Sequence, residues 1–148
     1  MYKPLFLAAA LLLPTFVMAG ECDLEITGSD AMQYDKAELT VPATCEEVSL
    51  TLKNGGTIAK QVMGHNWVLA KTADMAGVVE DGMKAGLDAN YVKADDTRIL
   101  ATTKVLGGGE SETVKFKIKD LAADSDLTYF CSFPGHSTMM KGKFIIKK

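Results

Sequence analysis

Histidine is scarce in this chain. Its 148 residues include only two histidines, His65 and His136, and three cysteines. Oxidases and reductases that work with several metal ions need a substrate-binding metal with an open position or a second metal cluster, and several more imidazoles to hold them. Two histidines cannot supply both sites. The count therefore argues against a multi-metal enzyme and leaves room for one small metal site.

Positive charge is also in short supply. The chain has 16 Lys and Arg residues against 19 Asp and Glu residues, which gives a formal net charge of −3. Nucleic-acid-binding proteins carry a basic stripe or patch, whereas the lysines here are scattered among acidic residues. We therefore expect no nucleic-acid partner.

No apolar run is long enough to cross a bilayer as a helix, which takes about 20 residues. The apolar stretch Leu5 to Phe16 follows the positive Lys3 and precedes Val17-Met-Ala19, which has the form of a cleavage site. This arrangement is typical of a secretory signal peptide. We expect residues 1–19 to be the signal peptide and residues 20–148 to form one domain. An uncleaved membrane anchor is the alternative.

The cysteines divide into a pair and a remainder. Cys22 and Cys45 lie in the N-terminal part of an exported chain, where an oxidising compartment favours a disulfide. Cys131 would then remain a free thiol that is available to a metal. A lipid on Cys22 is the alternative, but lipoprotein processing needs a small residue directly before the cysteine, and this chain has Glu21.

Alternating apolar and polar residues dominate the rest of the chain and predict half-buried strands. Val48, Leu50 and Leu52 show the pattern clearly. With turn residues between the runs, this spacing indicates an all-β fold, a two-sheet β-sandwich of about eight strands. The expected strands are Asp23 to Thr27, Ala37 to Pro42, Val48 to Leu52, His65 to Ala70, Arg98 to Leu106, Val114 to Ile118, Leu127 to Phe133 and Lys141 to Lys147.

One segment departs from this pattern. From Ala73 to Ala85 the apolar residues recur at helical spacing, with Thr72 or Asp74 as the N-terminal cap and Gly86 as the stop. We expect one short helix between strands.

Near the C-terminus, Cys131, His136 and Met140 follow one another in the order C-x4-H-x3-M. A copper ion that cycles between Cu(I) and Cu(II) takes a thiolate, imidazoles and a weak thioether. The turn at Pro134-Gly135 reverses the chain so that the ligands can converge. Spacing alone leaves Met139 as a competing thioether. His65 is the only other imidazole in the chain.

The sequences around these residues resemble the azurin family of blue-copper proteins. The resemblance rests on Val62-Met-Gly-His-Asn-Trp67, Tyr129-Phe-Cys-Ser-Phe-Pro-Gly-His136 and Met140-Lys-Gly142, and it extends from Glu21 to Lys148. It implies a cupredoxin-like Greek-key sandwich, a Cys22 to Cys45 disulfide, and a one-electron carrier in the periplasm.

The resemblance also implies how one type 1 copper would be held. His65, Cys131 and His136 would form a trigonal set, with Met140 as the weak axial ligand and the backbone oxygen of Gly64 opposite it. The choice between Met139 and Met140 is thereby decided in favour of Met140.

Around the ligands, the resemblance assigns Asn66 and Phe133 to the immediate surroundings of the metal. The Asn66 amide would tie the His65 strand to the Cys131 loop, the alternative being an ordinary surface residue. An apolar docking patch is implied as well, although Ile58 and Met83 could instead be core. Its members would be Met32, Ile58, Val62, Met63, Met83, Phe133, Gly135 and Met139.

Transient redox partners would dock at this patch, such as c-type cytochromes or copper- or haem-containing reductases. A copper store or chaperone is a weaker interpretation, because such proteins usually expose Met-rich or C-x-x-C ligands. A structural zinc site is also a weaker interpretation, because zinc prefers two or more thiolates. The chain departs from the family at Asn54, where many azurins have a histidine that is not a ligand.

Overall fold

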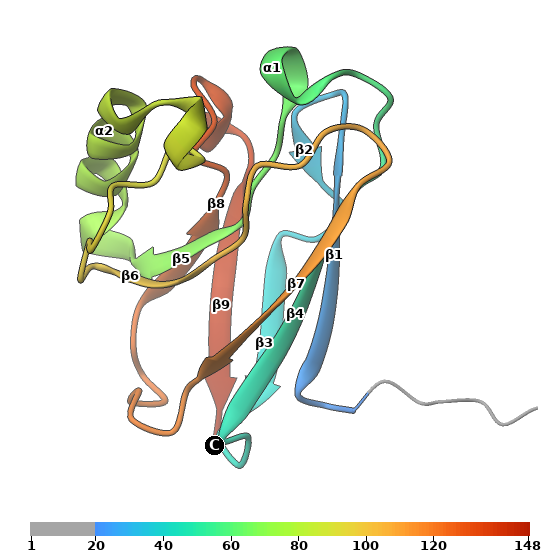
Figure 1. Cartoon of the computed structure of the whole chain (residues 1–148). Helices are drawn as coiled ribbons and strands as arrows, with labels where there is room; N and C mark the ends of the chain where they lie inside the picture. Colours follow the sequence, from blue (N-terminus) through green and yellow to red (C-terminus); the bar gives the residue numbers. More distant parts are fainter. Residues whose placement is uncertain (1–19) are drawn as a thin grey trace, which may run out of the picture.

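Two β-sheets packed face to face form the fold (Figure 1). The computed structural model describes residues 20–148, so the expected signal peptide at residues 1–19 lies outside the described residues. The four-stranded sheet has the order β2-β1-β4-β7, with β2 at Gln33–Tyr34, β1 at Asp23–Ser29, β4 at Glu47–Asn54 and β7 at Ser111–Lys117. The five-stranded sheet has the order β3-β9-β8-β5-β6, with β3 at Glu38–Pro42, β9 at Lys141–Lys147, β8 at Leu127–Phe130, β5 at Val68–Lys71 and β6 at Ile99–Thr102.

Both sheets mix parallel and antiparallel pairs. Strand β1 runs parallel to β4, and β3 runs parallel to β9, while the remaining pairs are antiparallel. Strands that follow one another in the sequence either pair directly, as β1 and β2, β5 and β6, and β8 and β9 do, or lie in different sheets. The expected all-β sandwich is confirmed, with nine strands in the described part of the chain where about eight were expected.

Alternation along the strands builds the core between the sheets. In β4, Val48, Leu50 and Leu52 are completely buried, and the centre is filled from the opposite side by Tyr129 of β8 and by Trp67, which directly precedes β5. The two aromatic rings stack with their centroids 6.0 Å apart. The period-two pattern therefore marks the inward faces correctly.

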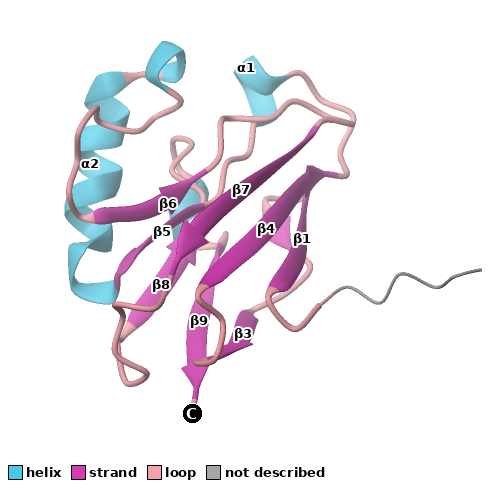
Figure 2. Ribbon diagram, turned by 60° about the horizontal axis from the view of Figure 1, so that its bottom comes forward, coloured by secondary structure: helices cyan, strands magenta, loops and turns pink. Residues whose placement is uncertain are grey.

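A helix closes the outer face of the five-stranded sheet over β5 and β8 (Figure 2). Helix α2, at Met75–Ala85, follows a 3₁₀ turn at Thr72–Asp74 and ends at Gly86, which has φ of 78°. Its Val78 packs against Val68 and Phe130. Because the core lies on one side of β5 and β8 and this helix on the other, both strands carry apolar residues on both faces.

Smaller helical turns were not expected from the sequence. Helix α1 is a single turn at Lys60–Met63, and 3₁₀ turns lie at Leu87–Ala89 and His136–Thr138. Helix α1 contains no buried residue, so it lacks the apolar periodicity by which helices are recognised. None of the helices in residues 20–148 has the length and apolar character that a membrane span requires.

Several strands are shorter than predicted. The predicted strand from His65 to Ala70 begins only at Val68, and His65 forms an isolated bridge with Leu106. The predicted strand from Leu127 to Phe133 ends at Phe130. The residues just before β5 and just after β8 therefore lie outside the regular ladder of hydrogen bonds and can turn toward each other.

The expected disulfide joins Cys22 to Cys45, with their Cα atoms 5.8 Å apart. Cys22 comes directly before β1 and Cys45 lies two residues before the start of β4, and these two strands are paired in parallel. Cys131 is buried and free.

Candidate metal centre

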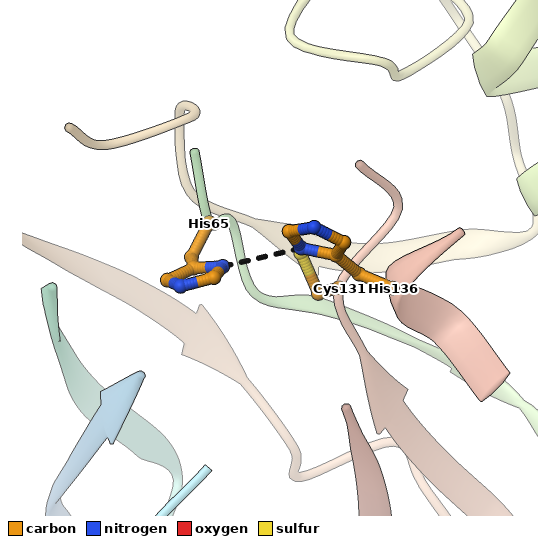
Figure 3. A group of neighbouring side chains, drawn as sticks. All are labelled: His65, Cys131 and His136. Atoms are coloured by element: carbon orange, nitrogen blue, oxygen red, sulfur yellow. Dashed lines mark hydrogen bonds between the residues drawn. The ribbon is translucent and has the colours of Figure 1, made fainter. Parts of the chain in front are cut away.

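Three potential metal-binding side chains, His65, Cys131 and His136, lie close together, as Figure 3 shows. One ligand atom from each of His65, Cys131 and His136 lies within 4.8 Å of the others. The exposed fractions of the three residues are 0%, 0% and 3%. Cys131 and His136 follow His65 by 66 and 71 positions in the sequence, and the fold brings all three residues to one buried point.

The orientation of the His65 ring directs a lone pair toward the other two residues. Its Nε2 lies 2.9 Å from the backbone oxygen of Ser29. Because a carbonyl oxygen can only accept a hydrogen bond, Nε2 must carry the proton, and Nδ1 is left without one. That Nδ1 lies 3.3 Å from Nδ1 of His136, which in turn lies 3.7 Å from the Cys131 sulfur.

Burial keeps both imidazoles in the neutral form that binds metals. It lowers the pKa of His65, and burial followed by the neighbouring His65 ring lowers the pKa of His136 to about 4. Burial raises the pKa of the Cys131 thiol to about 11, against the opposing effect of the backbone N–H groups of Asn66 and Phe133. A thiolate at this position needs a nearby cation, and a bound metal ion would supply it.

This donor set fits copper. One thiolate and two imidazoles suit a copper ion in both oxidation states, whereas structural zinc sites usually contain two or more thiolates. The neutral imidazoles and the buried sulfur therefore agree with the cofactor expected from the sequence.

Two backbone hydrogen bonds with Leu106 hold His65 in place. Its N–H donates to the Leu106 oxygen at 3.0 Å, and the Leu106 N–H donates to the His65 oxygen at 2.8 Å. The buried amide of Asn54 donates to the same Leu106 oxygen at 2.9 Å. Asn54 is thus part of the support for the His65 segment.

Gly64 precedes His65 at a crowded point. A Cβ atom there would collide with Val105 and with the backbone oxygen of Lys60. Glycine is therefore required for the chain to pass between helix α1 and Val105.

The C-terminal loop closes on itself through backbone hydrogen bonds. The Cys131 N–H donates to the Met140 oxygen at 3.0 Å, and the Met140 N–H donates to the His136 oxygen at 2.8 Å. Gly135, with φ of 81°, provides the left-handed conformation that starts the turn at His136. These bonds bring Cys131, His136 and Met140 together at the end of β8.

Asn66 links the two segments that carry the donors. Its Oδ1 accepts from the Ser132 N–H at 2.8 Å, and its Nδ2 donates to the Ser132 hydroxyl at 2.7 Å and to the Asn90 oxygen at 3.0 Å. Asn66 follows His65 and Ser132 follows Cys131. The buried Asn66 side chain thus connects the residues that follow two of the potential metal ligands, His65 and Cys131.

The two adjacent methionines have opposite environments. Met140 is completely buried and packs in a cluster with Cys131, Phe133 and Val105, whereas Met139 is 55% exposed. Phe133 is also buried, and its ring lies 4.6 Å from that of His136. Of the two thioethers, only Met140 belongs to the cluster that contains the buried sulfur.

Sequence reasoning missed the contribution of β1. The Ser29 oxygen holds His65, and Gly28 lies so close to the site that a Cβ atom there would be 2.9 Å from the His65 ring and 3.3 Å from the Met140 methyl group. A backbone carbonyl has no sequence signature, and one glycine in a strand gives no indication of what lies against it.

Comparison with known proteins places this centre in a known family. A family model described as copper binding proteins, plastocyanin/azurin family, matches residues 20–147. The chain is 58% identical over 122 residues to Azurin-1 of Alcaligenes xylosoxydans xylosoxydans, which covers 82% of this chain and 95% of that protein. It is 56% identical over 126 residues to the azurin of Bordetella pertussis, covering 85% of this chain and 84% of that one.

A solved structure has the same fold. An azurin from the obligate methylotroph Methylomonas sp. strain J matches with a TM-score of 0.84 and 43% identity, over 87% of this chain and 100% of that one. The resemblance found in the sequence motifs is thereby confirmed. With a buried sulfur and two imidazoles at its centre and with relatives of this similarity, the chain belongs to the plastocyanin/azurin family of copper-binding proteins.

Proposed function

We propose that this protein is a periplasmic one-electron carrier with one type 1 copper per chain, held by His65, Cys131 and His136. The observation that carries the proposal is the meeting of one sulfur and two imidazole nitrogens within 4.8 Å in a buried position. When bound there, copper would accept or give up a single electron by changing between Cu(II) and Cu(I).

Met140 and Gly64 complete the proposed ligand set. The burial of Met140 beside Cys131 supports it as the weak axial thioether, in preference to the exposed Met139. The backbone oxygen of Gly64 would lie opposite Met140. The collision that any side chain at Gly64 would cause keeps this backbone fixed directly before His65.

The protein would favour electron transfer by holding the ligand side chains in fixed positions and by excluding water from the metal site. Asn66 fixes the neighbours of His65 and Cys131, and Ser29 fixes the far side of the His65 ring. Burial of the donors excludes water from their positions. Since neither donor segment can relax freely, the geometry around the ion would change little when its charge changes.

Exposed apolar side chains support the proposed docking patch. In residues 20–148, four large apolar side chains are exposed, and all four belong to the predicted patch: Ile58, Val62, Met83 and Met139. Figure 1 shows α1, the C-terminal half of α2 and the turn at His136–Thr138 at one end of the molecule. Exposed apolar surface concentrated in this way marks an interaction site.

The other proposed members complete the surface. Met32 and Met63 are partly exposed, Gly135 is exposed, and buried Phe133 lies beneath, against the ring of His136. Partners that meet such a surface through apolar contacts can separate quickly, as an electron carrier requires. We propose c-type cytochromes or copper- or haem-containing reductases as the class of partner.

The ligand assignment can be tested by substitution. Cys131→Ser should abolish the blue colour of the copper protein, because a serine hydroxyl cannot replace the thiolate. Met140→Leu should leave a blue protein with a raised reduction potential, since the axial ligand tunes the potential. Visible absorption and voltammetry measure both effects. Met139→Leu is the matched control and should change neither, while a blue Cys131→Ser protein would contradict the assignment.

Gly28→Ala should weaken copper binding by about 10- to 100-fold, a range typical for changes beside metal ligands. The added methyl group would lie too close to the His65 ring and displace it from Ser29. Competition with a chelator measures the affinity. Thr27→Ala, at the preceding position of β1, is the control. Unchanged affinity and spectrum in Gly28→Ala would show that β1 does not position His65.

Charge in the docking patch should slow electron transfer and leave the copper centre intact. Met63→Lys or Met139→Lys should reduce electron self-exchange about tenfold or more, because the charged group must lose water in an apolar contact. The control is Ala76→Lys, which adds the same charge to the exposed surface near the other end of α2. Equal self-exchange rates in all variants would place the route of the electron elsewhere.

A further inference from the structure

Thioethers are concentrated on the proposed docking patch. Residues 20–148 contain six methionines, and four of them, Met32, Met63, Met83 and Met139, are members of the patch. Met139 is 55% exposed and Met83 is 48% exposed. An exposed thioether is the preferred methionine target of peroxides, which convert it to a sulfoxide.

We propose that Met139 is an oxidation site at which a peroxide switches off docking while the copper centre remains intact. The reaction transfers one oxygen atom from hydrogen peroxide to the Met139 sulfur. The O–O bond of the peroxide breaks, an S–O bond forms, and water is released. The sulfur loses two electrons and the peroxide gains them, so neither copper nor another reductant takes part. This inference rests on the docking role in the proposed function.

Position makes the oxidation selective. Met139 and Met140 are adjacent, yet Met139 faces solvent while Met140 is completely buried beside Cys131. The backbone N–H groups of Met139 and Met140 both donate to the backbone oxygen of His136, at 3.0 Å and 2.8 Å. The turn thus fixes two thioethers at neighbouring positions, one open to peroxide and one closed to it.

Oxidation changes the proposed docking patch beside His136. Met139 lies three residues after His136, in the turn that carries this donor. Its sulfide is apolar and fits a contact that excludes water. A sulfoxide has a strong dipole that must be desolvated without a partner when the apolar surfaces meet. A single oxygen atom would therefore oppose docking without altering any atom of His65, Cys131 or His136.

The modification is reversible. Methionine sulfoxide reductases return the sulfoxide to the thioether. Oxidation of Met139 would thus act as a switch that disconnects the carrier under peroxide stress and permits its recovery.

The test uses the complete copper protein in its Cu(II) form, treated with hydrogen peroxide for increasing times. Peptide mapping by mass spectrometry measures sulfoxide at each methionine, visible absorption reports the copper centre, and self-exchange is measured after removal of peroxide. Met139→Leu and Met83→Leu proteins receive the same treatment, and a sample of oxidised protein is returned with methionine sulfoxide reductase.

We expect sulfoxide to form at Met139 before any other described methionine and the blue absorption to persist. Self-exchange should fall about tenfold or more and recover after the reductase. After treatment, the Met139→Leu protein should keep the self-exchange rate that the same variant had before treatment, whereas the Met83→Leu protein should lose its rate as the unmodified sequence does.

Three results would overturn the inference. The first is oxidation of Met140 as fast as that of Met139. The second is an unchanged self-exchange rate in protein that is fully oxidised at Met139. The third is a loss of self-exchange rate in the treated Met139→Leu protein equal to that in the unmodified sequence. Untreated protein that has no blue absorption or does not exchange electrons would instead contradict the proposed function, and with it the basis of the switch. The untreated sample therefore separates the two failures.

Discussion

The burial of one sulfur and two imidazoles within 4.8 Å of one another is the constraint on which the rest of the structure depends. Such groups lose their hydration, and a thiolate among them requires a compensating cation. Copper fits this requirement, and the protein must keep the donors from moving apart. The mixed sheets, the closed C-terminal loop and the helix over β5 and β8 all serve to bring two chain segments to this point and hold them there.

Hydrogen bonds give the arrangement its rigidity. The His65 segment is bonded to Leu106 on one side and through its ring to Ser29 on the other, while Asn66 connects it to Ser132 of the second segment. Each link involves a buried or partly buried group, whose loss would leave an unpaired partner. The same rigidity separates the two adjacent thioethers: buried Met140 lies beside the sulfur and exposed Met139 lies on the proposed docking patch.

Much of this could be predicted from the sequence because the determinants are local. Alternation in Val48 to Leu52 marks a strand with one buried face, and the spacing from Cys131 to His136 across Pro134-Gly135 marks a ligand loop. Other features depend on distant partners. The Ser29 carbonyl acts through backbone geometry, and His65 lies before the start of β5, where it pairs with Leu106 outside the ladder. No periodicity in the chain encodes either contact.

X-ray absorption at the copper edge tests the central claim most directly. Protein loaded with one equivalent of copper should show a short copper–sulfur bond together with two nitrogen neighbours, in both the oxidised and the reduced state. The distances should differ little between the two states, because the surrounding hydrogen bonds restrict the donors. A copper ion with only nitrogen and oxygen neighbours would contradict the account, as would a nearest shell that rearranges on reduction.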